Sequence, residues 1–395
     1  MRLAPETEPA LADCVREAAS ARAPLAVEGN ASKRAWLRPV QAARTLSTAG
    51  LAGITLYRPK ELVLSARAGT PLAAIEAALA EHGQHLISEP PDLAALLGAV
   101  PATLGGTVAT NLSGPRRIAW GATRDHVLGV RAVNGAGEIF ASGGRVLKNV
   151  TGLDLCKLLA GSFGTLAVLS EITLKVLPAP ESVGTVVVET DDPAAGVAAL
   201  GQGLGSPFGV SAAAYLPQQA ASSVGLAASA AVLRIEDFAA SVVYRCGRLA
   251  GLLGGTVLPE APSRALWAGL RALAPLADAA DAADAAVWRL SVRPSAGPRV
   301  AALLLRAGAT AWFLDWGGGL VWIAGPPSEA MHQAVTGAAT GARGAWQLVR
   351  APDGLRAAVD VIPPEPAALA AIAARVKATL DPHGILNPGR MRAGS

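Results

Sequence analysis

The stretch ATLGGTVATNLSGPRRIAWGATRDHVLG, residues 102–129, combines bare backbone, short polar side chains and several arginines. Gly105 and Gly106 have no Cβ atom, so a ligand can approach their N–H groups closely. Backbone donors, hydroxyl and amide groups, and cations are together typical of a segment that binds phosphate. Small residues also form tight turns between strands, so the stretch alone leaves both interpretations open.

The composition narrows the class of protein. A chain of 395 residues is long enough for two domains. The formal charge of +4 is small and the arginines are scattered, so we expect no nucleic-acid partner. Cys14, Cys156 and Cys246 fit no zinc or iron–sulfur spacing and indicate a reducing compartment without a disulfide framework.

Two segments bear on location. The N-terminal residues MRLAPETEPALADC lack the apolar run of a secretory signal, which predicts a cytoplasmic protein. Residues 193–233 carry no charge, but Gly, Pro, Gln and Ser recur there. No interval in them reaches the ~20 strongly apolar residues that a membrane span needs, so we expect no transmembrane segment.

The order of predicted elements indicates an α+β protein. Short strands alternate with helices up to Pro178, and Pro178 and Pro180 mark a boundary. Residues 179–362 show the order βαββαβ twice, which predicts two ferredoxin-like halves that share one antiparallel sheet. A helix and the turn-rich segment LDPHGILNPGRM follow in residues 363–395.

Two common nucleotide signatures are absent. No GxGxxG follows the first strand and no GxxxxGK[ST] occurs, so neither a Rossmann dinucleotide site nor a Walker loop is indicated. Four segments, in order, instead resemble the vanillyl-alcohol-oxidase or PCMH-type FAD-binding domain. They are EGNASK (28–33), TLGGTVATNLSG with WGATRDHVLG (103–129), GSFGTLAVLSEITLKVLP (161–178) and LNPGR (386–390).

This resemblance implies a fold and a cofactor. Residues 1–178 would form a two-subdomain FAD-binding domain, 179–362 a ferredoxin-like α+β cap domain, and 363–395 a C-terminal segment that returns to the FAD domain. The implied FAD-binding residues are Gly29, Asn30, Ala31, Ser32, Lys33, Thr103, Gly105, Gly106, Thr107, Asn111, Ser113, Gly114, Gly121, Arg124, Asp125, Gly164, Glu171, Ile172 and Asn387. No histidine lies in residues 28–33, so we expect noncovalent FAD. Lys33 is a candidate cation for the diphosphate or a solvated loop lysine.

Some residues of these segments have a second interpretation. Arg124 and Asp125 are read as a pair that fixes the loop more readily than as a catalytic pair. Lys148, Asn149 and Asp154 are candidates for a wall near the flavin or for purely structural roles.

Substrate-side candidates lie in the second half of the predicted cap. Alternation in WRLSVRP places Arg289 on the sheet face opposite Trp288 and Leu290, and in AWFLDWGG it places Asp315 opposite Leu314. An arginine that faces the flavin can bind a carboxylate with two hydrogen bonds. The competing and favoured interpretation is a structural ion pair between Arg289 and Asp315.

The chain is more narrowly similar to the E-type FAD-binding subunits of bacterial glycolate oxidases. GNASK, GPRRIAWGATRDHVLG, GGRVLKNVTGLDL, WRLSV, LDWGG and LDPHGILNPGRM carry this resemblance. It implies oxidation of a small 2-hydroxy acid, glycolate to glyoxylate, with FAD as the electron acceptor. It also implies a second flavin subunit and an iron–sulfur subunit as partners, with any peripheral contact to the inner face of the membrane made through them.

One departure from related 2-hydroxy-acid dehydrogenases concerns the base and the metal. The five histidines do not form a histidine-rich motif, and Asp278, Asp281 and Asp284, interleaved with alanines, read as a solvated helix face. We therefore expect no metal, and the residue that takes the substrate proton stays open. A stand-alone D-lactate-type dehydrogenase and a non-catalytic, FAD-stabilised assembly subunit remain the alternatives.

Overall fold

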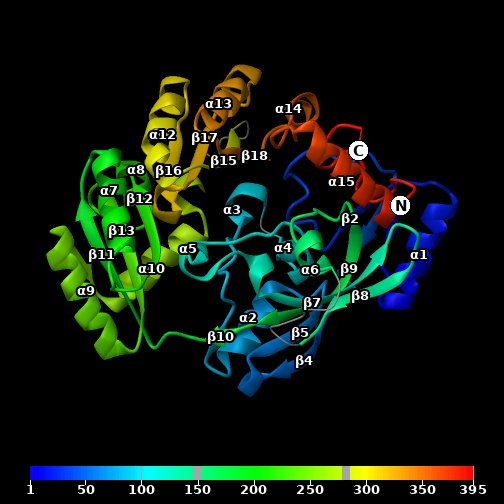
Figure 1. The fold of residues 1–395 in the computed structure, drawn as a ribbon, viewed down its shortest axis with the longest axis horizontal. Coiled ribbons are helices and arrows are strands. Elements are labelled where there is room, and N and C mark those ends of the chain that lie inside the picture. The colour runs from blue at the N-terminus through cyan, green and yellow to red at the C-terminus, as the bar shows by residue number, and fades with distance from the viewer. Residues whose placement is uncertain (99, 146–152, 278–284, 395) are drawn as a thin grey trace.

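The computed structural model describes residues 1–98, 100–145, 153–277 and 285–394 (Figure 1). It contains a small parallel sheet, a five-stranded sheet, a two-stranded sheet and an eight-stranded sheet. The predicted α+β fold class is confirmed, whereas the domain boundaries at 178 and 362 stay a prediction. The candidates Lys148 and Asn149 and the aspartates Asp278, Asp281 and Asp284 lie outside the described residues.

The N-terminal residues form the small parallel sheet, with strand order β1-β3-β2. The elements are β1 (Arg2–Leu3), α1 (Glu8–Ser20), β2 (Leu25–Glu28) and β3 (Arg44–Ser47). The Thr7 side chain accepts the N–H of Ala10 and begins α1. Leu11 of α1 packs with Leu25 and Leu46 of the sheet in one buried cluster, which holds β2 in place.

The second subdomain is the five-stranded antiparallel sheet, with order β4-β5-β9-β7-β8. Its strands are β4 (Ile54–Arg58), β5 (Val63–Arg67), β7 (Val127–Asn134), β8 (Ile139–Gly143) and β9 (Ala167–Lys175). The helices of this part are η1 (Pro59–Glu61), α2 (Leu72–Ala80), α3 (Ala94–Leu97), α4 (Leu104–Ala109), α5 (Arg117–Trp120), η2 (Thr123–His126) and α6 (Leu155–Leu159). Ile75 of α2 and Val108 of α4 pack against Ile172 of β9, which fixes α4 beside the sheet.

The eight-stranded sheet forms the cap, with order β14-β11-β13-β12-β16-β17-β15-β18. Its strands are β11 (Ser182–Glu189), β12 (Val210–Leu216), β13 (Ala230–Asp237), β14 (Thr256–Leu258), β15 (Ala286–Ser291), β16 (Ala311–Asp315), β17 (Leu320–Gly325) and β18 (Ala345–Arg350). Each half has the ferredoxin-like order βαββαβ, and the halves join where Tyr215 of β12 pairs with Leu314 of β16.

The helices of the cap complete this unit. They are α7 (Pro193–Leu204), α8 (Gln218–Ser222), α9 (Ala239–Leu253), α10 (Glu260–Arg271), η3 (Ala274–Leu276), η4 (Pro294–Ala296), α12 (Gly297–Arg306), η5 (Trp316–Gly318) and α13 (Glu329–Gly341). Within the described ranges, every helix is too short or too polar to span a bilayer.

A buried group of charges joins the cap to the N-terminal subdomains. Arg234 of β13 donates to both carboxylate oxygens of Glu89, at 2.8 and 2.7 Å. Arg116 donates to Glu236 of β13 at 3.0 and 2.6 Å and to His85 Nδ1 at 2.7 Å. Although burial alone would raise it, Arg234 and Arg116 hold the pKa of Glu236 at about 2. The seam between the domains is therefore ion-paired as well as apolar.

The C-terminal segment returns to the small sheet, as the fold class predicted. After α14 (Asp353–Ala358) and α15 (Ala367–Leu380), Leu386 pairs with Leu25 of β2 in a parallel bridge. The N–H of Leu25 donates to Ile385 O at 2.8 Å, and the N–H of Asn387 donates to Leu25 O at 2.9 Å. Figure 1 shows the two termini on the same side of the molecule, beside β2.

Candidate cofactor site

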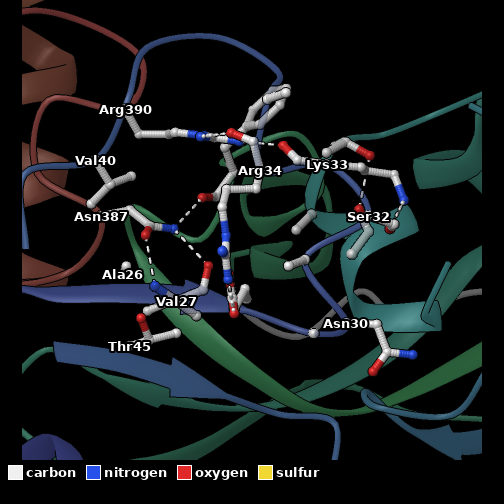
Figure 2. A pocket seen from close by; sticks show the side chains of 18 of the residues that line it. Ala26, Val27, Asn30, Ser32, Lys33, Arg34, Val40, Thr45, Asn387 and Arg390 are labelled. Atoms are coloured by element: carbon white, nitrogen blue, oxygen red, sulfur yellow. Dashed lines mark hydrogen bonds and ion pairs between the residues drawn. The ribbon is translucent and has the colours of Figure 1, made fainter. Parts of the chain in front are cut away.

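A cavity of about 710 Å³ lies beside the loop that follows β2 (Figure 2). Its walls come from that loop, from α4, from α14 and from the C-terminal tail. The candidate cofactor residues that line it are Gly29, Asn30, Ala31, Ser32, Lys33, Thr103, Gly106 and Asn387. Three of the four motif segments thus supply predicted residues to one cavity.

Gly29 and Thr103 meet at the wall of this cavity. A Cβ atom on Gly29 would stand 2.3 Å from Thr103 Oγ1, so the position requires glycine. Thr103 Oγ1 also accepts the N–H of Gly106 at 3.3 Å and so begins α4. A Cβ on Gly106 would lie 3.8 Å from Lys33 Nζ. The bare backbone leaves room for a group that approaches it closely.

Lys33 brings an ammonium group to the cavity. Its side chain is buried, and its ammonium group donates to Ser32 Oγ at 3.4 Å. No carboxylate of the described residues lies within ion-pair distance of Lys33. Burial lowers the pKa of Lys33 to about 8, against a smaller opposing effect of Asp92. A buried cation without an anionic partner fits the diphosphate of FAD.

Two arginines that sequence reasoning did not assign hold the loop. Arg390 donates to the carbonyl oxygens of Lys33 at 2.5 Å, Arg34 at 2.9 Å and Arg38 at 3.1 Å. Arg356 of α14 donates to Leu37 O at 2.8 Å. Figure 2 shows the Arg390 side chain reaching across the cavity to the loop. Burial lowers the pKa of Arg390 to about 9, and both guanidinium groups line the cavity.

Asn387 fixes the strand that leads into the loop. Its Oδ1 accepts the N–H of Val27 at 2.7 Å, and its Nδ2 donates to Phe163 O at 2.8 Å (Figure 2). A Cβ atom on Gly164 would stand 3.0 Å from this Nδ2. Asn387 therefore joins the third motif segment to β2, and its side chain shapes the wall.

The remaining candidates do not line the cavity in the described part of the chain. They are Gly105, Thr107, Asn111, Ser113, Gly114, Gly121, Arg124, Asp125, Gly164, Glu171 and Ile172. The N–H of Gly105 donates to Ala68 O at 2.7 Å, and a Cβ there would stand 2.8 Å from Ala68 Cβ. The predicted role of Gly105 as a diphosphate donor is thus corrected to packing of α4 on its neighbour.

Several of these residues fold the glycine-rich segment onto itself. Asn111 Oδ1 accepts the N–H of Arg124 at 2.9 Å, and Ser113 Oγ accepts the N–H of Thr123 at 2.9 Å. Asp125 accepts the N–H of Ala122 at 2.8 Å, and its carboxylate lies 3.7 Å from Arg124 with both side chains half exposed. These contacts agree with the loop-fixing interpretation of the Arg124–Asp125 pair.

Others serve the packing of the subdomains. A Cβ atom on Gly114 would stand 1.9 Å from Glu89 O, and one on Gly121 would stand 2.9 Å from Asp125 Oδ2. Ile172 is fully buried in the core of the five-stranded sheet, and Glu171 lies beside it on β9. Thr107 is buried with its hydroxyl unpartnered in the described chain. Asp154, a wall candidate, accepts the N–H of Lys157 and begins α6.

Arg289 and Asp315 do not form the expected ion pair within the described residues. Arg289 instead lies with its Cζ 5.4 Å from the ring centroid of Trp36, in the loop after β2. Among the residues that the structure describes, Trp36 Nε1 is buried without a partner. The same holds for Oε1 of Gln347, which pairs with Arg289 across β15 and β18. Burial, with the nearby charge of Arg117, lowers the pKa of Arg289 to about 10.

Asp315 has a different environment. Its Oδ1 accepts the N–H of Trp316 at 2.6 Å, and burial raises the pKa of the carboxyl to about 7. The Trp316 indole donates to Gly114 O at 3.0 Å, and Arg117 lies 4.4 Å above its ring. Asp315 therefore belongs to the seam between cap and FAD domain and lies outside the cavity lining.

The histidines lie away from the cavity in the described chain. His85 bonds Arg116, His332 accepts the Trp288 indole N–H at 3.2 Å, and His82 packs on Tyr57. Among the described residues, no three His, Cys, Asp or Glu side chains gather as a metal-binding group.

Comparison with known proteins identifies the chain's class. Residues 1–143 match the family model described as an FAD binding domain. A solved alkyldihydroxyacetonephosphate synthase superposes with a TM-score of 0.70 over 98% of this chain and 75% of that one, at 17% identity, which shows a common fold. Together with the relative described next, the family match makes the chain an FAD-dependent oxidoreductase of the PCMH type, and its cofactor is FAD.

A second comparison gives the family. The chain is 36% identical to glycolate oxidase subunit GlcE of Escherichia coli over 97% of both chains, and it belongs to that family. Shorter matches cover 22% of the chain, at 46% identity to a D-lactate dehydrogenase of Anaerostipes hadrus and 40% to glycolate oxidase subunit GlcD of Bacillus subtilis. They cover 18% of each of those proteins.

Proposed function

We propose that this chain is the FAD-binding subunit of a glycolate oxidase complex that oxidises a small 2-hydroxy acid, glycolate to glyoxylate. The end-to-end similarity to subunit GlcE supports this family-level assignment. The observation that carries the site is a buried ammonium, Lys33, without an anionic partner in the described chain, beside the Gly29–Thr103 contact. A buried cation at this position fits the diphosphate of FAD.

Different residues of the cavity have different roles in binding FAD. The loop of residues 29–33 offers N–H groups and short side chains, Thr103 adds a hydroxyl group before α4, and Lys33 supplies the charge. Arg390 and Arg356 keep the loop in shape by binding its carbonyl oxygens. Bound FAD supplies a two-electron acceptor for the hydride on the carbon that bears the hydroxyl. No residue of the loop supplies a histidine for a covalent link, so heat or acid should release all FAD.

Arg289 is the proposed ligand of the substrate carboxylate. It stands on the cap face toward the FAD-side loop, has no carboxylate partner within the described residues, and has Arg117 nearby as a second cation. A guanidinium in this state binds a carboxylate with two charge-assisted hydrogen bonds and orients the adjacent carbon. The Trp36 indole N–H, which has no partner in the described part of the chain, is a further donor beside it.

The proton of the substrate hydroxyl needs a base, and the described cavity offers no histidine. We therefore propose that the second flavin subunit and the iron–sulfur subunit complete the enzyme, the former with the base and the latter with the electron relay. The three cysteines are too few for an iron–sulfur cluster with four thiolates. The complex would work in the cytoplasm, with any contact to the membrane made through the partners.

The test uses the chain alone and co-expressed with both partners. We expect glycolate-dependent dye reduction in the complex and little in the isolated chain. Arg289→Ala should raise KM for glycolate about 30-fold or more in the complex, as lost charge-assisted hydrogen bonds predict, with FAD content unchanged. Arg293→Ala, an exposed neighbour, is the control. Full turnover by the isolated chain would favour a stand-alone dehydrogenase instead, and loss of FAD in Arg289→Ala would make Arg289 structural.

A further inference from the structure

Helix α9 leaves one of its faces uncovered. Val242, Cys246 and Leu249 are buried against the sheet of the cap. On the opposite side Val243 is 76% exposed and Tyr244 65% exposed. Figure 1 shows α9 at the left edge of the molecule, with no drawn element beyond it. Large apolar side chains grouped on one exposed face mark an interaction surface more often than chance exposure does.

Two glycines on this helix support the same conclusion. Gly247 and Gly251 are four residues apart and lie on one side of α9, close to Tyr244. A Cβ atom on either would meet nothing within 4 Å in the described chain. Glycine inside a helix is destabilising relative to alanine, and no contact in the described ranges requires it at these two positions. Small residues at this spacing allow a second helix to approach the backbone closely.

The charge of the surface indicates the kind of partner. Residues 239–259 contain no Asp or Glu. Arg245 is paired with Asp237, whereas exposed Arg248 has no ion pair in the described part of the chain. A symmetric pair of copies joined through this face would bring two Arg248 side chains together without a carboxylate from residues 239–259. A complementary surface is apolar and carries carboxylates.

Another exposed region lies at the start of α9, beside the seam between the domains. A second cavity, of about 540 Å³, lies between α5 and the start of α9 and is lined by Trp120, Phe238 and Arg245. Phe238 is 73% exposed, and Trp120 of the FAD domain is half exposed. Aromatic side chains that border a cavity are typical anchors of protein interfaces. A chain bound here would contact the cap and the FAD domain together.

We propose that the outer face of α9, made of Val243, Tyr244, Gly247, Arg248 and Gly251, docks a different subunit of the same oxidase. The partner presents an apolar helix with carboxylates, which packs over Gly247 and Gly251 and pairs with Arg248. The identity of the partner as an oxidase subunit rests on the proposed function. The assignment of this face as a docking surface rests only on its exposed side chains, its glycines and its charge.

The experiment co-expresses the tagged full-length chain with the second flavin subunit and the iron–sulfur subunit of the same organism. Complex formation is measured by co-purification and by the dissociation constant of the purified proteins. Gly247→Leu, Tyr244→Glu and Arg248→Glu are compared with Leu369→Glu, which alters an exposed leucine on α15. FAD content and the melting temperature of each variant show that it is folded. Arg248→Glu changes an exposed side chain only, so the test stands even where Gly247→Leu destabilises α9.

We expect the three α9 variants to weaken binding of one partner subunit at least tenfold, while Leu369→Glu binds like the wild type. A wild-type complex that all three variants still form would overturn the docking surface and leave the proposed function standing. A wild-type chain that binds neither subunit would overturn the proposed complex and this docking site with it. Self-association abolished by the same variants would identify a second copy as the occupant and refute the proposal.

Discussion

Replacing Lys33 by methionine should have opposite effects on two quantities. It should raise the free energy of unfolding of the apoprotein and lower the affinity for FAD. Burial lowers the pKa of Lys33 from 10.5 to about 8. At 1.36 kcal/mol per unit, the buried ammonium destabilises the apoprotein by about 3 kcal/mol at neutral pH. Lys33→Met should therefore stabilise the apoprotein by up to that amount. If the diphosphate of FAD pairs with the buried ammonium, its binding offsets this destabilisation. The variant should then bind FAD about two orders of magnitude more weakly than the wild type.

The sign of the pH dependence follows from the same shift. Between pH 8 and 10.5 the unfolded chain binds more protons at Lys33 than the folded apoprotein does, so the wild-type apoprotein gains stability as the pH rises. FAD binding has the opposite trend. The charged fraction of Lys33 falls from about nine-tenths at pH 7 to about one-tenth at pH 9, so the dissociation constant of FAD should rise about tenfold. Lys33→Met should show no such rise.

The assay is titration of apoprotein with FAD, followed by flavin fluorescence at pH 7 and pH 9, together with chemical unfolding of the apoprotein. Lys60→Met, at an exposed lysine, is the matched control, and Lys33→Arg keeps the charge at both pH values. A Lys33→Met apoprotein that is less stable than the wild type, and that binds FAD with unchanged affinity at both pH values, would refute the reasoning.

Three further predictions concern the loop after β2, the C-terminal tail and the seam between the domains. Gly29→Ala should lower FAD content because its Cβ meets Thr103 Oγ1 at 2.3 Å, and adding Thr103→Ala should restore part of it; equal content in both variants would contradict the contact. Arg390→Met should remove three hydrogen bonds to loop carbonyls and lower both FAD content and the free energy of unfolding, by about 3 kcal/mol, whereas Arg375→Met on exposed α15 should change neither in absorbance and denaturant titrations. Asp315, whose folded pKa of about 7 lies above the ordinary 3.8, contributes stability below pH 4 that is lost as the pH rises through 7, so Asp315→Asn should exceed the wild type in stability at pH 8 and not at pH 4 in parallel unfolding curves.

The sequence predicted the fold and the faces of the strands better than the contacts within the site. Strand alternation placed Arg289 on the face away from Trp288, and that face does meet the FAD-side loop. The predicted ion pair of Arg289 with Asp315 was wrong. Arg289 contacts Trp36 instead, and this contact joins a strand and a loop more than 250 residues apart, so no local sequence pattern indicates it. Hydrophobic periodicity is local, and pairing across a domain seam is not.

The glycine-rich stretch shows the same limit. Gly29, Gly105 and Gly114 lack a Cβ because other atoms of the chain stand there. At Gly106, which borders the cavity, the nearest atom to a Cβ would be Thr103 Oγ1 at 3.2 Å. A bare backbone position indicates close approach, and sequence alone does not say whether a ligand or the chain itself approaches. Arg390 was missed for a related reason: its partners are carbonyl oxygens, which every residue has.

The ion pairs across the seam limit how this family can exchange its parts. Arg234 and Glu236 of the cap neutralise Glu89 and Arg116 of the FAD domain, so a cap transplanted from a relative brings two buried charges that its new host must match. A chimera joined near residue 178 that lacks one of these four residues would hold an unpaired buried charge. Chimeras between relatives should therefore fold when all four positions come from the same parent. In a library of shuffled sequences, the folded members should share matching residues at these positions.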